Sequence, residues 1–442
     1  MSQAIKKSIF WKSIPLSLQI AIALFLAVVV GILFGAGNPN PNLIATINHL
    51  AIPCNLILKA LRALATPLIL LAVLHGFLTV HIPGRSGRKL AVLLLTNTLV
   101  AIVIGLLVAN VLQPGRWWRV ESFGSVPVNK TLDPWGLLQD MVPPSILQPL
   151  VDNNVIQLVF IALSFGVILR AVKTEQIAQG KEDYRPIEQV ITILFEAVMG
   201  VLKWVIALVP VAVFGIVAKT IALQGFQPFL SLAAFIVAVL LALLLQAIYY
   251  ITRVKYGCWV SPKRFISGSS DALLTAFSTA SSTATMPITF KALMQKVGIR
   301  ESSASLGALV GSNFNNDGTA LYEAMSALFV GQLLGLHLNL PQQFMVVLTS
   351  IVASVGAAGI PEAGLVTMTL VFTAVGLPTQ YIALLVTVDW FLDRCRTAIN
   401  VMGDMTISCL LDGRKQHIEA VNVSEGVAYL EDDLSRPEAH RE

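Results

Sequence analysis

Two stretches near the end of the chain decide the fold: STASSTATMP at 278–287 and GAAGIPEAG at 356–364. Each lies in a run long enough for two short helices and interrupts it with small polar residues, glycine or proline. At membrane depth such a backbone is tolerated only where it is packed inside protein or lines a cavity. We therefore expect two re-entrant helical hairpins, at about 262–299 and about 343–378.

A helix with an internal polar cluster is expected after each hairpin. The helix at about 302–332 contains SNFNNDGT (312–319), and the helix at about 380–411 contains DWFLDRCRTAINVMGD (389–404). Basic residues flank the first hairpin, whereas the loop before the second has neither Lys nor Arg, so the two enter from opposite sides. This order predicts an inverted repeat with its binding site at the membrane midplane.

The composition is that of a membrane protein. The 442 residues are 55% hydrophobic and only 12% charged, with a mean hydropathy of +0.75. Soluble domains carry about 25% charged residues, so nucleic-acid binders, disordered tails and most soluble enzymes are excluded. Apolar runs of the length that a spanning helix needs predict six further helices within 15–251, at 15–35, in part of 43–80, and at 90–112, 155–172, 189–222 and 228–251.

The expected fold is thus an all-α integral membrane protein with eight transmembrane helices and two re-entrant hairpins. Lys and Arg gather in 1–14, 81–89, 170–186 and 252–264, which places the N-terminus and alternate loops in the cytoplasm. The transport core is expected at 252–412, and 413–442 is expected to be a cytoplasmic tail. The four cysteines and six histidines form no metal-binding or disulfide pattern.

One stripe of the last helix carries the polar chemistry. At about 100° per residue its five members fall within roughly 80° of one another: Asp389, Asp393, Arg396, Asn400 and Asp404. Because polar groups are costly in a membrane, the stripe must face protein or water. It is either a structural network of ion pairs between helices or a binding site for a zwitterion that carries one further anionic group.

The residue types favour an acidic amino acid as the ligand. Arg396 offers a planar fork that matches a carboxylate, and Asp393 offers a partner for an ammonium group. Asn400 can serve the main-chain carboxylate. Asp404 and Asp317 are hard oxygen donors suited to a small cation.

Four motifs resemble those of the dicarboxylate/amino acid:cation symporter family, which includes archaeal aspartate transporters and animal excitatory amino acid transporters. They are SSTATMPITF (281–290), NNDGTALYEA (315–324), AAGIPEAGLVTM (357–368) and VDWFLDRCRTAINVMGD (388–404). The six N-terminal helices match the family in order and character rather than by motif. The resemblance implies a homotrimer in which helices 1, 2, 4 and 5 hold the subunits together. The hairpins with helices 3, 6, 7 and 8 would move as a transport domain.

The resemblance also implies the site residues. Substrate contacts would come from Ser282, Thr319, Ile360, Gly364, Asp393, Arg396 and Asn400, with Arg394 in the place that animal members use for an arginine. Sodium ligands would come from Thr96, Asn97, Gly311, Asn315, Asp317, Ser354, Ala357, Asn400 and Asp404. Glu323 stands where animal members have a proton-coupling glutamate, and the alternative is a neutral, hydrogen-bonded core residue. Asn316, Leu93, Asn97 and Glu362 depart from the family pattern.

The expected function is therefore sodium-coupled uptake of L-glutamate or L-aspartate by a homotrimer in a bacterial plasma membrane. Sodium is the co-transported ion, and neither an enzymatic activity, an organic cofactor nor a nucleic-acid partner is expected. The alternatives are a proton-coupled carrier, a neutral amino acid or C4-dicarboxylate transporter of the same fold, and a substrate-gated ion conductance. A C4-dicarboxylate lacks an ammonium partner for Asp393, and a neutral amino acid would leave Arg396 unpaired.

Overall fold

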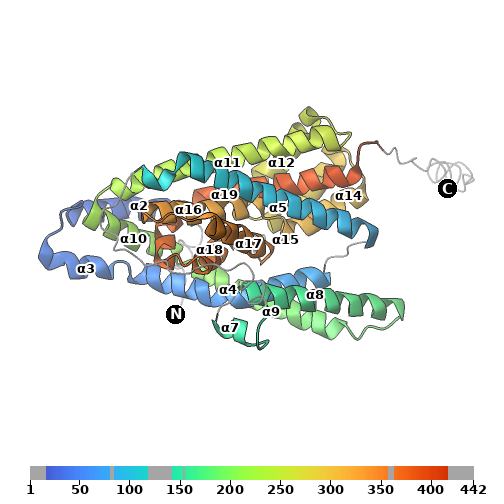
Figure 1. Ribbon diagram of the computed structural model, residues 1–442, viewed down its shortest axis with the longest axis horizontal. Helices are drawn as coiled ribbons and strands as arrows, with labels where there is room; N and C mark the ends of the chain where they lie inside the picture. The colour runs from blue at the N-terminus through green and yellow to red at the C-terminus, as the bar shows by residue number, and fades with distance from the viewer. Residues whose placement is uncertain (1–15, 80–83, 118–141, 153–154, 357–362, 417–442) are drawn as a thin grey trace, which may run out of the picture.

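The computed structural model describes residues 16–79, 84–117, 142–152, 155–356 and 363–416. Every regular element in these ranges is a helix, and most of the long helices run roughly along one axis (Figure 1). The expected all-α class is confirmed.

The N-terminal part of the chain supplies the long apolar helices. They are α2 (Leu16–Leu33), α3 (Ile44–His49), α4 (Ile52–Thr79), α5 (Gly84–Leu112), α7 (Gln148–Asp152), α8 (Val155–Ala178), α9 (Arg185–Ile206), α10 (Val209–Gln224) and α11 (Gln227–Gly257), with 3₁₀ turns at Pro41–Leu43 and Pro114–Arg116. The expected single helix over 189–222 is instead two, α9 and α10. Pro210 lies in the first turn of α10, where its missing N–H costs nothing, and it could not continue α9.

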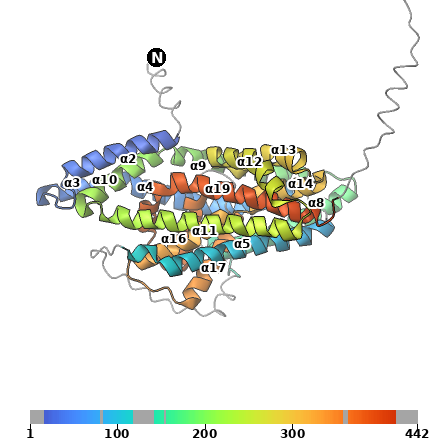
Figure 2. The ribbon, with the colours of Figure 1, turned by 90° about the horizontal axis from the view of Figure 1, so that it is seen from above.

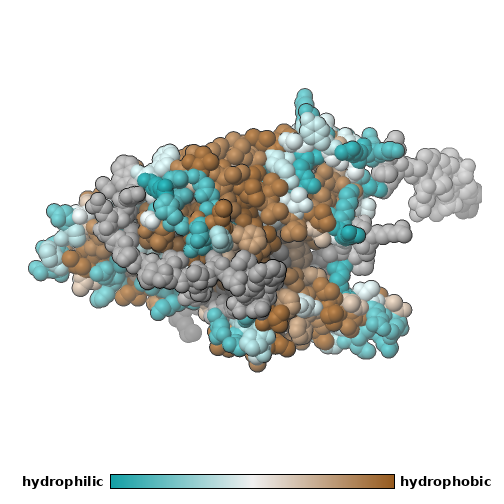
Figure 3. All heavy atoms as spheres, in the orientation of Figure 1, coloured by the Kyte–Doolittle hydropathy of each residue, from teal (hydrophilic) through white to brown (hydrophobic). Residues whose placement is uncertain are grey.

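The surface is suited to lipid. Four stretches of the described chain are long and apolar enough to cross a membrane: Pro41–Thr79, Gly87–Arg116, Arg185–Gln224 and Pro228–Gly257. Large apolar side chains on them face outward; Leu107 is 60% and Trp204 76% exposed. On the face shown in Figure 3, hydrophobic residues cover the middle, and hydrophilic residues gather toward the two ends of the long axis. Exposed apolar surface on this scale is unfavourable in water.

Two helix pairs follow α11. The first is α12 (Pro262–Thr279) with α13 (Ser282–Ala292), which pack against each other. The chain turns between them at Ala280, whose φ of 52° is left-handed, and the Ser281 hydroxyl accepts a hydrogen bond from the N–H of Ala284 at 3.1 Å to cap α13. The second is α17 (Leu340–Gly356) with α18 (Ala363–Ala374), also packed together. The residues that join α17 to α18 lie outside the described ranges.

The helix expected at about 302–332 is interrupted. It consists of α14 (Glu301–Ser305), a π-helical turn Leu306–Val310, α15 (Gly311–Phe314) and α16 (Asp317–Leu333), and another π turn, Leu293–Val297, follows α13. Asn315 and Asn316, with ψ of 77° and 49°, are not helical. The unwound pair leaves backbone groups of α15 and α16 without partners inside the helix, so these groups are available to neighbouring side chains.

The last helix, α19 (Ile382–Asp412), follows a 3₁₀ turn at Thr379–Tyr381 and lies in the middle of the bundle in both views (Figures 1 and 2). It packs against α11, α12, α13, α16 and α18. A helix surrounded in this way can place a polar stripe in the interior only if neighbouring helices supply partners.

Candidate functional site

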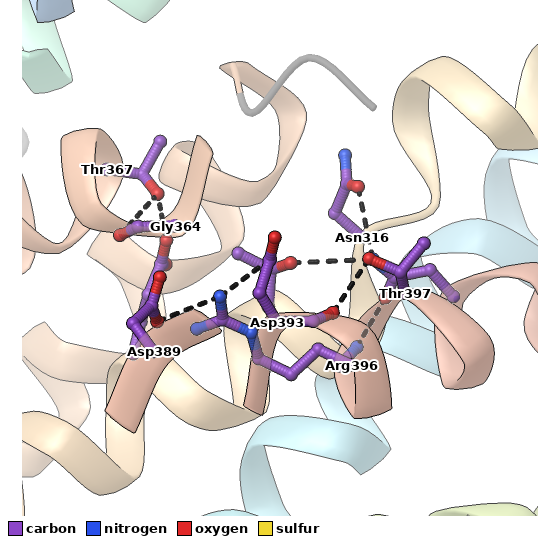
Figure 4. Close-up of polar contacts among 11 residues, drawn as sticks. Asn316, Gly364, Thr367, Asp389, Asp393, Arg396 and Thr397 are labelled. Carbon is purple, nitrogen blue, oxygen red and sulfur yellow. Dashed lines mark hydrogen bonds and ion pairs between the residues drawn. The ribbon is translucent and has the colours of Figure 1, made fainter. Parts of the chain in front are cut away.

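The polar stripe of α19 is buried. Figure 4 shows Asp389, Asp393 and Arg396 along α19, with Gly364 and Thr367 of α18 beside them. All five members of the predicted stripe are at most 5% exposed: Asp389, Asp393, Arg396, Asn400 and Asp404.

Arg396 is the centre of the stripe. Its Nη2 lies 2.7 Å from Asp393 Oδ1 and 3.0 Å from Asp389 Oδ1, and its guanidinium carbon lies 4.0 Å from the centre of the Tyr322 ring. The side chain is 0% exposed. Its Nε and Nη1 have no hydrogen-bond partner within the described part of the chain. One nitrogen therefore holds the ion pairs, and two buried donors remain available to an acceptor.

The unwound segment is tied to α19 through Asn400. Asn400 Oδ1 accepts a 2.7 Å hydrogen bond from the N–H of Gly318 in the first turn of α16, and its backbone carbonyl accepts one of 3.1 Å from Asn315 Nδ2. Its Nδ2 lies 3.4 Å from Asn316 Oδ1 and from Thr319 Oγ1. A Cβ at Gly318 would meet the Arg396 carbonyl at 2.7 Å. Glycine is needed for this close approach of the two helices.

Asp317 accepts two hydrogen bonds from other helices. Thr98 of α5 donates to Oδ1 at 2.7 Å, and the Tyr250 hydroxyl of α11 donates to Oδ2. Thr96, the other threonine of α5 and a sodium ligand implied by the resemblance, makes a different contact. Its hydroxyl donates to the Val92 carbonyl of its own helix, because Thr96 and Thr98 project from different faces of α5.

Asn97, the other predicted ligand on α5, is also engaged elsewhere. It is completely buried, and its Oδ1 accepts a hydrogen bond from Arg253 of α11. The residue of α5 that donates a hydrogen bond to Asp317 is therefore Thr98, which was not among the predicted site residues.

Asp404, Asn315 and Gly311 form a second polar position. Asp404 Oδ1 and Asn315 Oδ1 are buried and lack a hydrogen-bond partner among the described residues. A Cβ at Gly311 would lie 2.4 Å from Asp404 Oδ1, so only glycine lets the α15 backbone approach the carboxylate. Within the described ranges no three His, Cys, Asp or Glu side chains group as metal ligands. A cation here would draw on amide and backbone oxygens as well as the carboxylate, as hard cations do.

The remaining predicted residues are spread over several segments of the chain. Ser282 is the buried first residue of α13, which packs against α15 and α19. The backbone carbonyl of Ser354, near the end of α17, accepts a 3.0 Å hydrogen bond from Asn316 Nδ2. Ala357 and Ile360, together with Glu362, lie outside the described residues.

Arg394 projects away from the stripe toward α12. Its Nη1 donates to the carbonyls of Phe277 and Ser278, at 3.2 and 2.7 Å. These carbonyls belong to the last turn of α12, where a positive charge is favourable.

Glu323 is completely buried on α16. One of its carboxyl oxygens, Oε1, accepts a hydrogen bond from Thr367 of α18, and Oε2 has no partner in the described part of the chain. Thr98, Tyr250 and Thr367 thus belong to this polar network although the sequence analysis missed them. Single hydroxyls in apolar helices give no periodic signal, and only their neighbours identify them.

The comparisons with known proteins give the family of the chain. The model of the sodium:dicarboxylate symporter family matches residues 16–414. Excitatory amino acid transporter 3 of Homo sapiens is 28% identical, over 97% of this chain and 91% of its own length. An excitatory amino acid transporter of Caenorhabditis elegans is 31% identical, over 81% of this chain and 80% of its own. With a match over nearly its whole length, the chain belongs to the sodium:dicarboxylate symporter family.

Proposed function

We propose that the protein takes up L-glutamate and L-aspartate together with sodium ions. The observation that carries the proposal is the pair of free donors on Arg396, its Nε and Nη1, which are buried without a partner among the described residues. Buried donors left unpaired are costly, and acceptor oxygens that a bound acidic substrate brings to them would satisfy them. Asp389 and Asp393 both pair with Nη2 of Arg396 and so fix the orientation of the guanidinium.

The rest of the site fits an amino acid rather than a simple dicarboxylate. Asp393 lies beside Arg396 and gives an ammonium group a partner within reach of the same ligand. Thr319 and the amide of Asn400 are available to the main-chain carboxylate. A C4-dicarboxylate would add negative charge next to Asp393 with nothing to compensate it, and a neutral amino acid would leave the Arg396 donors unsatisfied.

Sodium is the proposed coupling ion. Asp404, Asn315 and the backbone at Gly311 place hard oxygens around one buried position. Asp317, directly after the unwound segment, is a further buried carboxylate. Because Asn315 also donates to the Asn400 carbonyl, a cation bound here would order the helix that carries the substrate contacts. Glu323 is the candidate for an additional proton, since burial disfavours the charged form of a carboxyl group.

The assembly and location follow the family resemblance. We propose a homotrimer in a bacterial inner membrane, with α5, α11 and the helices from α12 to α19 moving as the transport unit. Its two helix pairs, α12–α13 and α17–α18, would form the re-entrant hairpins on either side of the substrate. As a member of a transporter family the protein is not an enzyme.

The test is uptake of radiolabelled L-glutamate and L-aspartate into proteoliposomes, with an inward sodium gradient or with choline. Uptake that requires sodium and is lost in Arg396→Ala supports the proposal. Equal uptake in choline under a pH gradient would transfer the coupling to protons, with Glu323→Gln as the next variant. No uptake of either amino acid under any gradient would contradict the proposed substrate.

A further inference from the structure

Arg253 holds a permanent positive charge near the buried carboxylate of Asp317. It lies one turn after Tyr250 on α11, and its Nη1 donates to Oδ1 of the fully buried Asn97 on α5. Its guanidinium carbon lies 5.6 Å from the centre of the Tyr249 ring. An arginine side chain is not deprotonated in proteins, so this charge is present at every physiological pH.

The same two helices hold Asp317. Thr98, the residue after Asn97, donates to one oxygen of Asp317, and Tyr250 donates to the other. Arg253 is close enough to Asp317 for the two charges to interact. The carboxylate therefore has a hydrogen bond on each oxygen and a cationic neighbour that belongs to the protein itself.

A basic residue near a helix end commonly extends to the membrane surface. Lys255 does so in the last turn of α11: its Nζ lies 5.3 Å from the ring of Tyr256, which is 65% exposed. Arg253 instead reaches a side chain that is completely buried. The side chains of Arg253 and Lys255 thus point in different directions although both lie near the same end of α11. Lys255 therefore provides a matched control.

We propose that Arg253 is a resident cation that takes the place of one sodium ion at the Asn97–Asp317 position. The amide oxygen that would bind sodium is already occupied by the guanidinium, and a second cation beside it would be repelled at low dielectric. Sodium then binds at the Asp404–Asn315 position without competition from Arg253. The inference rests on the proposed function. It predicts one coupled sodium ion fewer per substrate than if both the Asn97–Asp317 position and the Asp404–Asn315 position bound sodium.

The test is the sodium-to-substrate ratio of wild type and Arg253→Met, which keeps an unbranched apolar stem and removes the guanidinium with its charge. Proteoliposomes with equal potassium on both sides and valinomycin hold the membrane potential at zero. Each coupled sodium then adds about a factor of ten in substrate accumulation per tenfold sodium gradient, because free energy is logarithmic in concentration. Arg253→Met should accumulate about tenfold more than wild type at equilibrium, whereas Arg253→Lys and Lys255→Gln should match wild type.

Adding Asn97→Ala to Arg253→Met removes the freed oxygen and should abolish the gain. Equal ratios in wild type and Arg253→Met would overturn the inference. If Arg253→Met folds but does not transport, calorimetric titration of the substrate-free protein with sodium decides: one more ion than wild type supports the inference, and equal numbers overturn it. Sodium-independent uptake by wild type is a separate result, which refutes the proposed sodium coupling and this inference with it.

Discussion

Replacing Gly364 with alanine tests whether α18 faces the bound substrate. A Cβ at this position would lie 3.1 Å from Nη1 and from Nη2 of Arg396 and 3.2 Å from its Cζ. These distances are below the roughly 3.5–4.0 Å at which non-bonded heavy atoms pack best. The guanidinium cannot withdraw freely, because Asp389 and Asp393 hold its Nη2. The new methyl group therefore occupies space beside Nη1, one of the two free donors that we assign to the substrate.

The expected effect is the loss of about one charge-assisted hydrogen bond. Such a bond contributes about 1.5–3 kcal/mol, which corresponds to a roughly 10- to 150-fold increase in the half-saturating concentration of glutamate. Sodium binding to the substrate-free protein should stay unchanged, because the three atoms nearest to a Cβ at Gly364 belong to Arg396 and not to Asp404 or Asn315.

The measurement is KM for sodium-driven uptake, with sodium affinity of the purified protein measured in parallel. Gly200→Ala is the matched control, since a Cβ at that helical glycine of α9 has nothing within 4 Å. A Gly364→Ala protein that reaches the membrane in normal amounts and keeps a KM within twofold of wild type would refute the reasoning. The carboxylate would then bind away from Arg396 Nη1.

Three further substitutions test the neighbouring contacts. Tyr250→Phe leaves one oxygen of the buried Asp317 carboxylate without its donor, at a cost of about 1–3 kcal/mol; we expect the melting temperature to fall by the same amount in choline and in saturating sodium, because Arg253 keeps sodium from this carboxylate. Arg394→Gln removes the positive charge at the end of α12, so hydrogen exchange should accelerate in the last turn of that helix and remain unchanged in α16. Asp412→Asn removes the negative charge that pairs with Arg300 Nε at 2.9 Å. The new side-chain amide can also turn its NH2 group toward the indole N–H of Trp259, so that two donors face each other. The variant should melt below wild type at neutral pH, and an unchanged melting temperature would show that this contact contributes little.

Periodicity and desolvation cost were sufficient to predict the stripe on α19. Asp393 and Arg396 were assigned to one buried face because any other orientation would expose charges to lipid, and both are buried in the structure. The all-α class followed from composition for the same reason. These predictions depend on properties of a single helix, which a sequence contains in full.

Contacts between helices were harder to predict. Asn315 and Asn316 give no local signal that the helix unwinds there, because the unwound backbone is stabilised by Asn400 and by the end of α17. Whether Thr96 or Thr98 contacts Asp317 depends on how α5 is rotated about its axis relative to α16. Apolar residues lie on every face of α5 around these threonines, so the sequence pattern does not determine this rotation. Pro210, in contrast, was visible in the sequence, and it explains the break between α9 and α10.

The charge balance of the site gives coupling a physical basis. Among the described residues the interior holds one fully buried guanidinium, that of Arg396, and five buried carboxyl groups around it and the unwound segment: Asp317, Glu323, Asp389, Asp393 and Asp404. An acidic amino acid adds a net negative charge, which this interior can accept only if cations or protons enter with it. Substrate and cation must therefore raise each other's affinity by the same factor, since linkage between two binding equilibria is reciprocal. A cation position that already contains a resident guanidinium cannot take part in this exchange, so each fixed charge in the core lowers the number of ions that the gradient must supply.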